Sequence, residues 1–214
     1  MKSVYFLSDA HLGCRSIPHD RTRERRLVRF LDGIKDKASA VYLLGDIFDF
    51  WYEYKTVVPR GYTRFLGKLS ELADRGVEVH FFTGNHDIWC GDYLVKECGV
   101  TLHTEPMTVE MGDKVFMLAH GDGLGDPDHK FRFLRAVFRN RLCQRMFSCI
   151  HPRWAVDFGL SWAAHSRQKH GVEGGDPPYL GEDKEYLVRF AKEYLKAHSE
   201  INYFIFGHRH IELD

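Results

Sequence analysis

Short apolar runs alternate with longer amphipathic stretches along the first half of the chain. Residues 4–7, 41–44 and 77–82 are rich in β-branched and aromatic side chains, which predicts three strands. Between these runs, residues 23–34 and 62–75 carry apolar side chains at helical spacing, which predicts two helices. Because strands that alternate with helices usually form parallel units, this order predicts an α/β fold.

The second half of the chain predicts strands that pair in a different way. Residues 108–111 and 114–118 flank Gly112-Asp113, which is the pattern of a β-hairpin. A further apolar run at 203–206 predicts one more strand. We therefore expect antiparallel as well as parallel strands, and hence a mixed sheet structure.

A helical segment lies between these strands. It begins after Asp128, and its apolar residues recur every four positions, which predicts one long helix. These residues are Leu134, Phe138, Leu142 and Met146. Residues 171–181 are rich in Gly and Pro and predict a loop, and residues 183–198 predict a final helix. We therefore expect residues 125–182 to form a helical lid insertion within a single domain of residues 1–214.

Composition narrows the class of protein. The 214 residues, of which 44% are hydrophobic, suffice for the core of one domain. Thirty basic and thirty acidic side chains cancel, so no overall charge favours nucleic acid as a partner. The five cysteines include no CxxC pair, which favours buried, reduced thiols over a disulfide framework or a thiolate zinc site.

The sequence contains no segment with the length and hydrophobicity of a signal peptide or a transmembrane helix. We therefore expect a soluble protein of the cytoplasm. The apolar run at 211–213 predicts the start of one more strand, so we also expect the natural chain to continue beyond Asp214.

Five short segments place Asp, Asn or His directly after a predicted strand. They are DAH at 9–11, GDIFD at 45–49, GNHD at 84–87, HGD at 120–122 and GHRH at 207–210. A single segment of this kind is more often an ordinary turn, and a lone His is more often a packed or exposed residue. Loops at the carboxyl ends of strands, however, form the ligand crevice of α/β sheets. Five such segments in order therefore predict one common site.

The side chains in these segments indicate a metal centre. Carboxylate, imidazole and amide groups without a thiolate suit a catalytic site for Mn²⁺, Fe or Zn²⁺, and Mn²⁺ is the first choice. Asp9 and His11 are two positions apart, as are His208 and His210, so neither pair can share one face of a helix. The spacing therefore predicts that these residues lie on loops.

The five segments together resemble the signature of the calcineurin-like metallophosphoesterase superfamily over residues 9–210. The resemblance implies a two-sheet β-sandwich flanked by helices, with two divalent metal ions. It implies that one ion is held by Asp9, His11, Asp46 and His210. It implies that the second ion shares Asp46 and is completed by Asn85, His120 and His208. Two such ions, about 3.5 to 4 Å apart, would lower the pKa of a shared water and clamp phosphate oxygens.

Two further residues of these segments are candidates for catalysis. In the resembled superfamily the residue at the place of His86 is not a ligand and faces the substrate. We expect His86 to stabilise transition-state charge or to protonate the leaving oxygen, with Asp49 orienting its imidazole. The alternative for Asp49 is a capping residue of its loop, because Asx turns are common.

The predicted insertion is both basic and aromatic. Between residues 130 and 169 the only acid is Asp157. The basic residues are Lys130, Arg132, Arg135, Arg139, Arg141, Arg145, Arg153, Arg167 and Lys169. The interleaved aromatic residues are Phe131, Phe133, Phe138, Phe147, Trp154, Phe158 and Trp162. This composition fits a surface that meets acyl chains and anionic lipid head groups. The alternative is an ordinary amphipathic helix with its apolar stripe in the core.

The order of GDIFDFW, GNHD and HGDGLGDPD before a basic helical insertion closely resembles the UDP-2,3-diacylglucosamine hydrolase family of lipid A biosynthesis. The resemblance implies cleavage of a pyrophosphate to UMP and 2,3-diacylglucosamine 1-phosphate beneath a helical lid. It implies a nucleotide-linked glycolipid substrate and peripheral association with the inner leaflet of the inner membrane. The implied substrate-binding residues are Asp128, Phe131, Arg153, Arg167 and Lys169. The sequence departs from the pattern at Phe131, where the family has Tyr, and at His86, where well-known members have Arg.

Three other functions compete with this one. A phosphomonoesterase or protein phosphatase would share all seven predicted ligands and would not need a basic, aromatic lid. A nuclease would use Arg and aromatic side chains on single strands, with a steep dependence on salt. A non-enzymatic metal-binding scaffold is the least favoured, because every predicted ligand is present.

Overall fold

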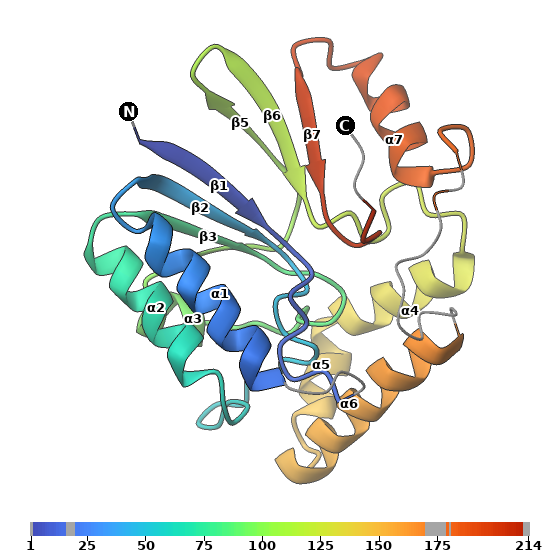
Figure 1. Cartoon of the computed structure of the whole chain (residues 1–214). Coiled ribbons are helices and arrows are strands. Elements are labelled where there is room, and N and C mark those ends of the chain that lie inside the picture. Colours follow the sequence, from blue (N-terminus) through green and yellow to red (C-terminus); the bar gives the residue numbers. More distant parts are fainter. Residues whose placement is uncertain (1, 16–19, 170–178, 180, 212–214) are drawn as a thin grey trace.

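The computed structural model consists of two facing sheets, with helices on the outside of each (Figure 1). It describes residues 2–15, 20–169, 179 and 181–211, with the backbone alone for residues 20 and 165–169. Three helices form a separate group beyond the lower ends of the sheets in Figure 1. The predicted α/β fold with two sheets is confirmed.

The first sheet has four parallel strands in the order β1-β2-β3-β4. They are β1 (Ser3–Leu7), β2 (Ala38–Leu44), β3 (Glu78–Phe82) and β4 (Thr101–His103). The connecting helices, on the outer face of this sheet in Figure 1, are α1 (Asp20–Ile34), α2 (Thr63–Asp74) and α3 (Tyr93–Cys98). Neither α3 nor β4 was predicted. With six and three residues, these elements are too short to show a clear periodicity in the sequence.

The second sheet has three strands in the order β5-β6-β7. They are β5 (Met107–Met111), β6 (Lys114–Ala119) and β7 (Tyr203–Phe206). The predicted hairpin is confirmed by the antiparallel pairing of β5 with β6, and β7 then pairs with β6 in parallel. Helix α7 (Tyr186–Leu195) packs on this sheet through Phe190, whose ring centroid lies 6.2 Å from that of Phe206.

Strand β2 separates the two parts of the core. Val41 and Leu43 face the cluster that packs under α1 and α2, whereas Tyr42 and Leu44 face the cluster between the two sheets. Successive side chains of a strand point to opposite faces, so a strand that is buried on both faces is apolar throughout. The strand therefore joins both layers, and the loop that follows it starts from a rigid position.

The insertion consists of α4 (His129–Arg139), α5 (Arg141–Phe147) and α6 (Pro152–Lys169). The prediction of one long helix through Met146 is wrong, because the chain changes direction at Asn140. The backbone of Asn140 is extended, and its side chain accepts hydrogen bonds from the N–H groups of Leu142 and Cys143. Asn favours such caps over helix interiors, so this residue ends α4 and starts α5.

Other predictions have mixed outcomes. The last helix ends at Leu195 rather than at residue 198. None of the five cysteines forms a disulfide, as expected, but Cys149 is exposed, so the expectation that they are buried is wrong there. Most of the predicted loop at 171–181 and the strand start at 211–213 lie outside the described residues.

Helix α2 depends on a side chain from α1 for its first turn. Its N-cap residue, Tyr62, makes no side-chain cap, and the buried carboxylate of Glu24 accepts hydrogen bonds from the N–H groups of Arg64 and Phe65 instead. We predict that Glu24→Ala lowers the free energy of unfolding by about 1 to 2 kcal/mol, because two helix donors lose their acceptor. Urea denaturation measures this loss. The matched change Glu97→Ala, at an exposed residue of α3, should have almost no effect, and equal losses would contradict the capping role.

Candidate metal centre

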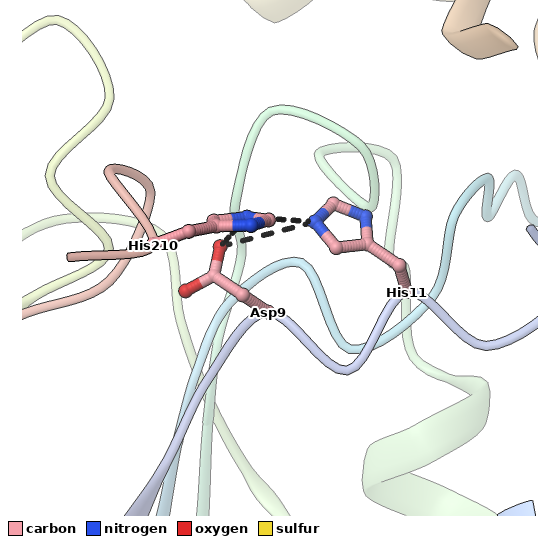
Figure 2. Close-up of side chains that lie close together, drawn as sticks. All are labelled: Asp9, His11 and His210. Atoms are coloured by element: carbon pink, nitrogen blue, oxygen red, sulfur yellow. Dashed lines mark hydrogen bonds and ion pairs between the residues drawn. The ribbon is translucent and has the colours of Figure 1, made fainter. Parts of the chain in front are cut away.

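The five motif segments meet at the ends of the strands. The loops after β1, β2, β3, β6 and β7 carry, in that order, Asp9 and His11, Asp46 and Asp49, Asn85 and His86, His120, and His208 and His210. Figure 2 shows that Asp9, His11 and His210 point toward one another, although 199 positions separate His11 from His210. The structure thus brings all seven predicted ligands into one region.

Asp9, His11 and His210 form the first candidate group. The Nε2 atom of His210 lies 3.2 Å from Asp9 Oδ1 and 3.2 Å from His11 Nε2. His11 Nε2 lies 3.9 Å from Asp9 Oδ1. Ring nitrogens and a carboxylate oxygen that converge in this way have the spacing of ligands around one cation.

Asp46 lies between this group and a second one. Its side chain is buried, and its Oδ2 atom is 3.4 Å from His120 Nε2, 3.9 Å from His11 Nε2 and 4.0 Å from His86 Nε2. Potential ligand atoms of Asp46, His120 and His208 all lie within 4.8 Å of one another, as do those of His11, Asp46 and His86. Asp46 is therefore placed to serve two neighbouring ions.

Asn85 belongs to the second group. Its Oδ1 atom lies 3.2 Å from His120 Nε2. The ring centroids of His120 and His208 are 5.1 Å apart, and the Phe131 ring lies 5.9 Å from that of His208. The amide oxygen and the two imidazoles thus lie close together beside Asp46.

Two imidazoles are fixed through Nδ1. His120 Nδ1 lies 2.8 Å from the Leu44 carbonyl oxygen, and His86 Nδ1 lies 2.9 Å from the Asp49 carbonyl oxygen. His11 Nδ1 lies 3.4 Å from Asp49 Oδ1 but forms no hydrogen bond with it. In a neutral imidazole, a hydrogen bond donated from Nδ1 sets the tautomer and leaves Nε2 as an acceptor toward the centre.

The position of Asp49 differs from the predicted arrangement. Its buried carboxylate is closer to His11, at 3.4 Å, than to His86, at 3.8 Å. His86 is held by the main chain of Asp49, so the carboxylate is better placed to orient His11.

The backbone at the site is held in an unusual conformation. Among the described residues, six that are not Gly have a positive φ, and five of these are Asp9, His11, Asp46, His208 and His210. Left-handed backbone is costly for residues with a Cβ, and it persists only where the surrounding structure enforces it. The concentration of this conformation in the predicted ligands marks the region as a functional site.

Glycines let the loops approach one another closely. A Cβ on Gly84 would lie 2.2 Å from Asp46 Oδ1, and one on Gly207 would lie 2.6 Å from Asp9 Oδ2. Gly45, with φ 85°, passes against the ring of His120 in the same way. These glycines bring the ligand loops together, because a residue with a Cβ could not approach so closely.

Asp87 is a structural residue of the site that sequence reasoning missed. Its fully buried carboxylate accepts hydrogen bonds from the backbone N–H groups of Asp46, Ile47, Phe48 and Gly84. It thereby joins the loop after β2 to the loop after β3. The signal was present, because Asp87 is the last residue of GNHD, but its role depends on contacts 40 positions away.

The electrostatics of the centre favour added positive charge. Burial alone would raise the pKa of Asp46, but the facing His120, His86 and His11 hold it well below its usual value. Burial would lower the pKa of His120, but the Asp46 carboxylate raises it to about 10. Burial and the neighbouring His120 lower the pKa of His208 to about 4. The Asp46 carboxylate therefore attracts positive charge at a place where a divalent cation fits.

Of the predicted substrate-binding residues whose side chains are described, only Phe131 lines a cavity beside the centre. Asp128 instead caps α4, accepting hydrogen bonds from the N–H groups of Lys130 and Phe131. Arg153 is exposed at the start of α6 and is not part of the cavity wall. The side chains of Arg167 and Lys169 lie outside the described residues.

The close packing at Gly84 allows a direct test of Asp46. We predict that Gly84→Ala leaves the protein folded but weakens binding of divalent cations by at least tenfold, because the added methyl displaces the Asp46 carboxylate. Calorimetric titration with Mn²⁺ measures this change. In the control Gly67→Ala, the methyl in α2 meets nothing within 4 Å and should leave cation binding unchanged. Unaltered cation binding in Gly84→Ala would contradict the central place of Asp46.

The sequence has clear relatives among known proteins. A UDP-2,3-diacylglucosamine hydrolase from Porphyromonas gingivalis is 45% identical, covering 99% of this chain and 84% of that protein. A UDP-2,3-diacylglucosamine hydrolase from Neisseria meningitidis is 32% identical, covering 82% of this chain and 72% of that protein. A solved phosphoesterase from E. coli, at 20% identity, covers 58% of this chain and 59% of its own with a TM-score of 0.36.

The family model for calcineurin-like phosphoesterases matches residues 2–212, which include all five segments that meet at the site. Members of this family carry divalent metal ions, and the carboxylate, imidazole and amide groups found here suit such ions. The chain is therefore a metallophosphoesterase, a hydrolase that belongs to the calcineurin-like phosphoesterase family.

Proposed function

We propose that this chain hydrolyses the pyrophosphate bond of UDP-2,3-diacylglucosamine to UMP and 2,3-diacylglucosamine 1-phosphate, a step of lipid A biosynthesis. The names of both relatives support this substrate. The observation that carries the proposal is an apolar cavity that opens directly beside Asn85 and His86. A sugar phosphate, or another phosphomonoester with only polar groups, has no apolar group that would fill such a cavity.

The cavity lies between the insertion and the sandwich. Helices α4 and α6 contribute Phe131, Leu134, Phe138, Phe158 and Trp162, and the sandwich contributes Phe50, Ile88 and Trp89. Its volume of about 110 Å³ is close to that of cavities that hold a single small aromatic ring, about 150 Å³. Only part of an acyl chain fits inside, so the remainder must extend along the outside of the insertion.

The outside of the insertion is apolar where such a chain would run. Phe133 is 71% exposed and Trp154 is 69% exposed, and Leu142 and Met146 are also exposed. Exposed aromatic side chains among arginines suit the interface of an anionic lipid surface. We therefore propose that residues 125–182 act as a lid that also rests on the membrane, on its cytoplasmic side.

The described part of the chain includes no helix with the length and hydrophobicity needed to span a bilayer. The proposed membrane contact therefore depends on the surface of the lid. Arg135 lines the cavity as well, and its guanidinium pairs with the buried Asp122 carboxylate. This pair holds a basic group near the place where the diphosphate would lie.

The proposed ligand assignment follows the two candidate groups. Asp9, His11, Asp46 and His210 would hold one ion, and Asp46, Asn85, His120 and His208 would hold the other, with Mn²⁺ favoured over Fe or Zn²⁺. Two such ions supply charge that polarises the phosphate and lowers the pKa of a water.

His86 is proposed to act on the substrate. Its Nε2 atom faces the centre, and its Nδ1 atom lies 2.9 Å from the Asp49 carbonyl oxygen, to which only an N–H can donate. Nδ1 must therefore carry a proton, so His86 can donate from Nε2 only as imidazolium. In that form it would stabilise the charge on a phosphate oxygen or protonate the leaving oxygen.

His86 also favours a second candidate function. The well-known lipid A enzymes that the sequence resembles have Arg at this position, whereas generic phosphomonoesterases of the superfamily use His. A comparison of diacylated and deacylated substrates therefore tests the role of the lid, and substitution of His86 tests its role in catalysis separately.

We predict that the diacylated substrate is hydrolysed with a kcat/KM at least about 10² times that of deacylated UDP-glucosamine. Each buried CH₂ contributes about 0.8 kcal/mol, so four methylenes in the cavity contribute about 3 kcal/mol. The change Phe158→Ala should reduce this ratio, because the ring lines the cavity. The control Phe30→Ala, at another exposed aromatic residue but on α1, should not. Equal kcat/KM values for the two substrates would contradict the proposed substrate and favour a phosphomonoesterase function.

We predict that His86→Ala retains bound Mn²⁺ but lowers kcat by about 10² or more, the usual effect of losing an acid-base group. Elemental analysis measures metal content, and a turnover assay measures kcat. His198→Ala, which removes an exposed imidazole far along the chain, serves as the control. A loss of metal in His86→Ala would assign His86 to the ligands, as its place near His11 and Asp46 allows.

A further inference from the structure

A partly buried ion pair connects the last ligand segment to helix α7. Arg209 lies between His208 and His210, and its Nε and Nη2 atoms donate to Glu185 Oε2 and Oε1 at 3.0 and 2.9 Å. The Glu185 side chain is only 3% exposed. Two parallel hydrogen bonds fix the plane of a guanidinium as well as its position, so the pair holds Arg209 in one orientation.

The segment that carries Arg209 needs such support. His208 and His210 have φ values of 69° and 51°, in the left-handed region. Between them, the Arg209 N–H donates to the Gly207 carbonyl oxygen at 2.8 Å. On the other side, the His208 N–H donates to the Asp9 carboxylate. Because this backbone is strained, the segment keeps its shape only where contacts on both sides enforce it.

Glu185 belongs to a rigid part of the molecule. It is the N-cap residue of α7, where its N–H donates to the Gly181 carbonyl oxygen and its carbonyl oxygen accepts from Arg189. Helix α7 packs on β7 through Phe190, against which Gly125 also lies closely. The carboxylate is therefore presented from a helix end whose position is set by the second sheet.

We infer that Glu185 and Arg209 are positioning residues that hold the His208 and His210 rings in the direction needed to bind divalent ions. This inference rests on the proposed ligand roles of the two histidines. His208 is in the candidate group with Asp46 and His120, and His210 is in the group with Asp9 and His11. If Arg209 is not held in place, the binding of both ions is therefore weakened, rather than the binding of one.

The test compares Mn²⁺ binding by metal-free proteins. Arg209→Gln removes the ion pair, and Arg209→Lys keeps the charge but loses the two parallel bonds. Mutation of a residue that supports a metal ligand typically lowers metal affinity by about 10- to 100-fold. We therefore expect the Mn²⁺ dissociation constants of Arg209→Gln to rise by about that factor. Arg209→Lys should recover only part of the loss. Calorimetric titration gives the constants, and Mn²⁺ electron paramagnetic resonance gives the number of bound ions.

Two further variants separate positioning from folding. The double change Glu185→Gln and Arg209→Gln leaves no buried charge unpaired, so it guards against unfolding of the single variant. It should show the same weakening of Mn²⁺ binding. The control Lys192→Gln breaks an exposed ion pair, in which Lys192 Nζ on α7 lies 2.5 Å from Glu182 Oε2 in the turn before that helix. It should bind Mn²⁺ as the wild type does, and the melting temperature of each metal-free protein checks its fold.

The outcomes are distinct. Weaker Mn²⁺ binding by both Arg209→Gln and the double variant, with normal binding by Lys192→Gln, supports the inference. Wild-type constants in folded Arg209→Gln or in the double variant overturn it while leaving the proposed function intact. A wild-type protein that binds no Mn²⁺ overturns both the inference and the proposed ligand assignment.

Discussion

The carboxylate of Asp46 is almost fully buried, and three ring nitrogens face it at 3.4 to 4.0 Å. Asp87, a second buried carboxylate, lies directly behind the same loop, and burial together with the charge of Asp46 raises its pKa to about 7. Two buried acids so close together are unfavourable unless positive charge is near. The need to accommodate the Asp46 charge explains why imidazoles, and in this family divalent cations, gather at this point.

The fold meets this requirement through the rigidity of β2 and the sharpness of the turns that follow the strands. Both faces of β2 are covered, so the loop that carries Asp46 starts from a fixed position. Its direction is then set by four N–H groups that donate to Asp87, and by a left-handed turn at Asp46 itself. The strain at Asp46 is therefore balanced by hydrogen bonds from two loops, together with the burial of Ile47 and Phe48 in the core.

The sequence predicts those parts of the structure that follow from local pattern. Alternating apolar runs predict the sheets, and polar residues after strands predict where Asp9 or His120 lies, because parallel strands end at one edge. Asn140 was misjudged because four-residue periodicity outweighed its capping preference, although both signals were present. Glu185 and Arg135 could not be found in this way, since each acts through a partner that only the tertiary fold brings near. Strand β4 is too short to leave any pattern.

The attachment of the insertion supports a role for its apolar surface outside the core. Neither α4 nor α5 contains a buried residue. These helices are tied to the sandwich by two hydrogen bonds, in which Trp89 Nε1 donates to the Phe138 carbonyl oxygen and Tyr52 Oη donates to the Gln144 carbonyl oxygen. The rings of Phe138 and Phe147 also pack against Trp89. Helix α6 approaches through small residues such as Gly159, on which a Cβ would lie 2.2 Å from the Phe50 ring. Phe133, Leu142, Met146 and Trp154 remain exposed, and their contact with water is a cost that a ligand or a surface can offset. An acyl chain that enters the cavity beside His86 and continues along this face would remove that cost.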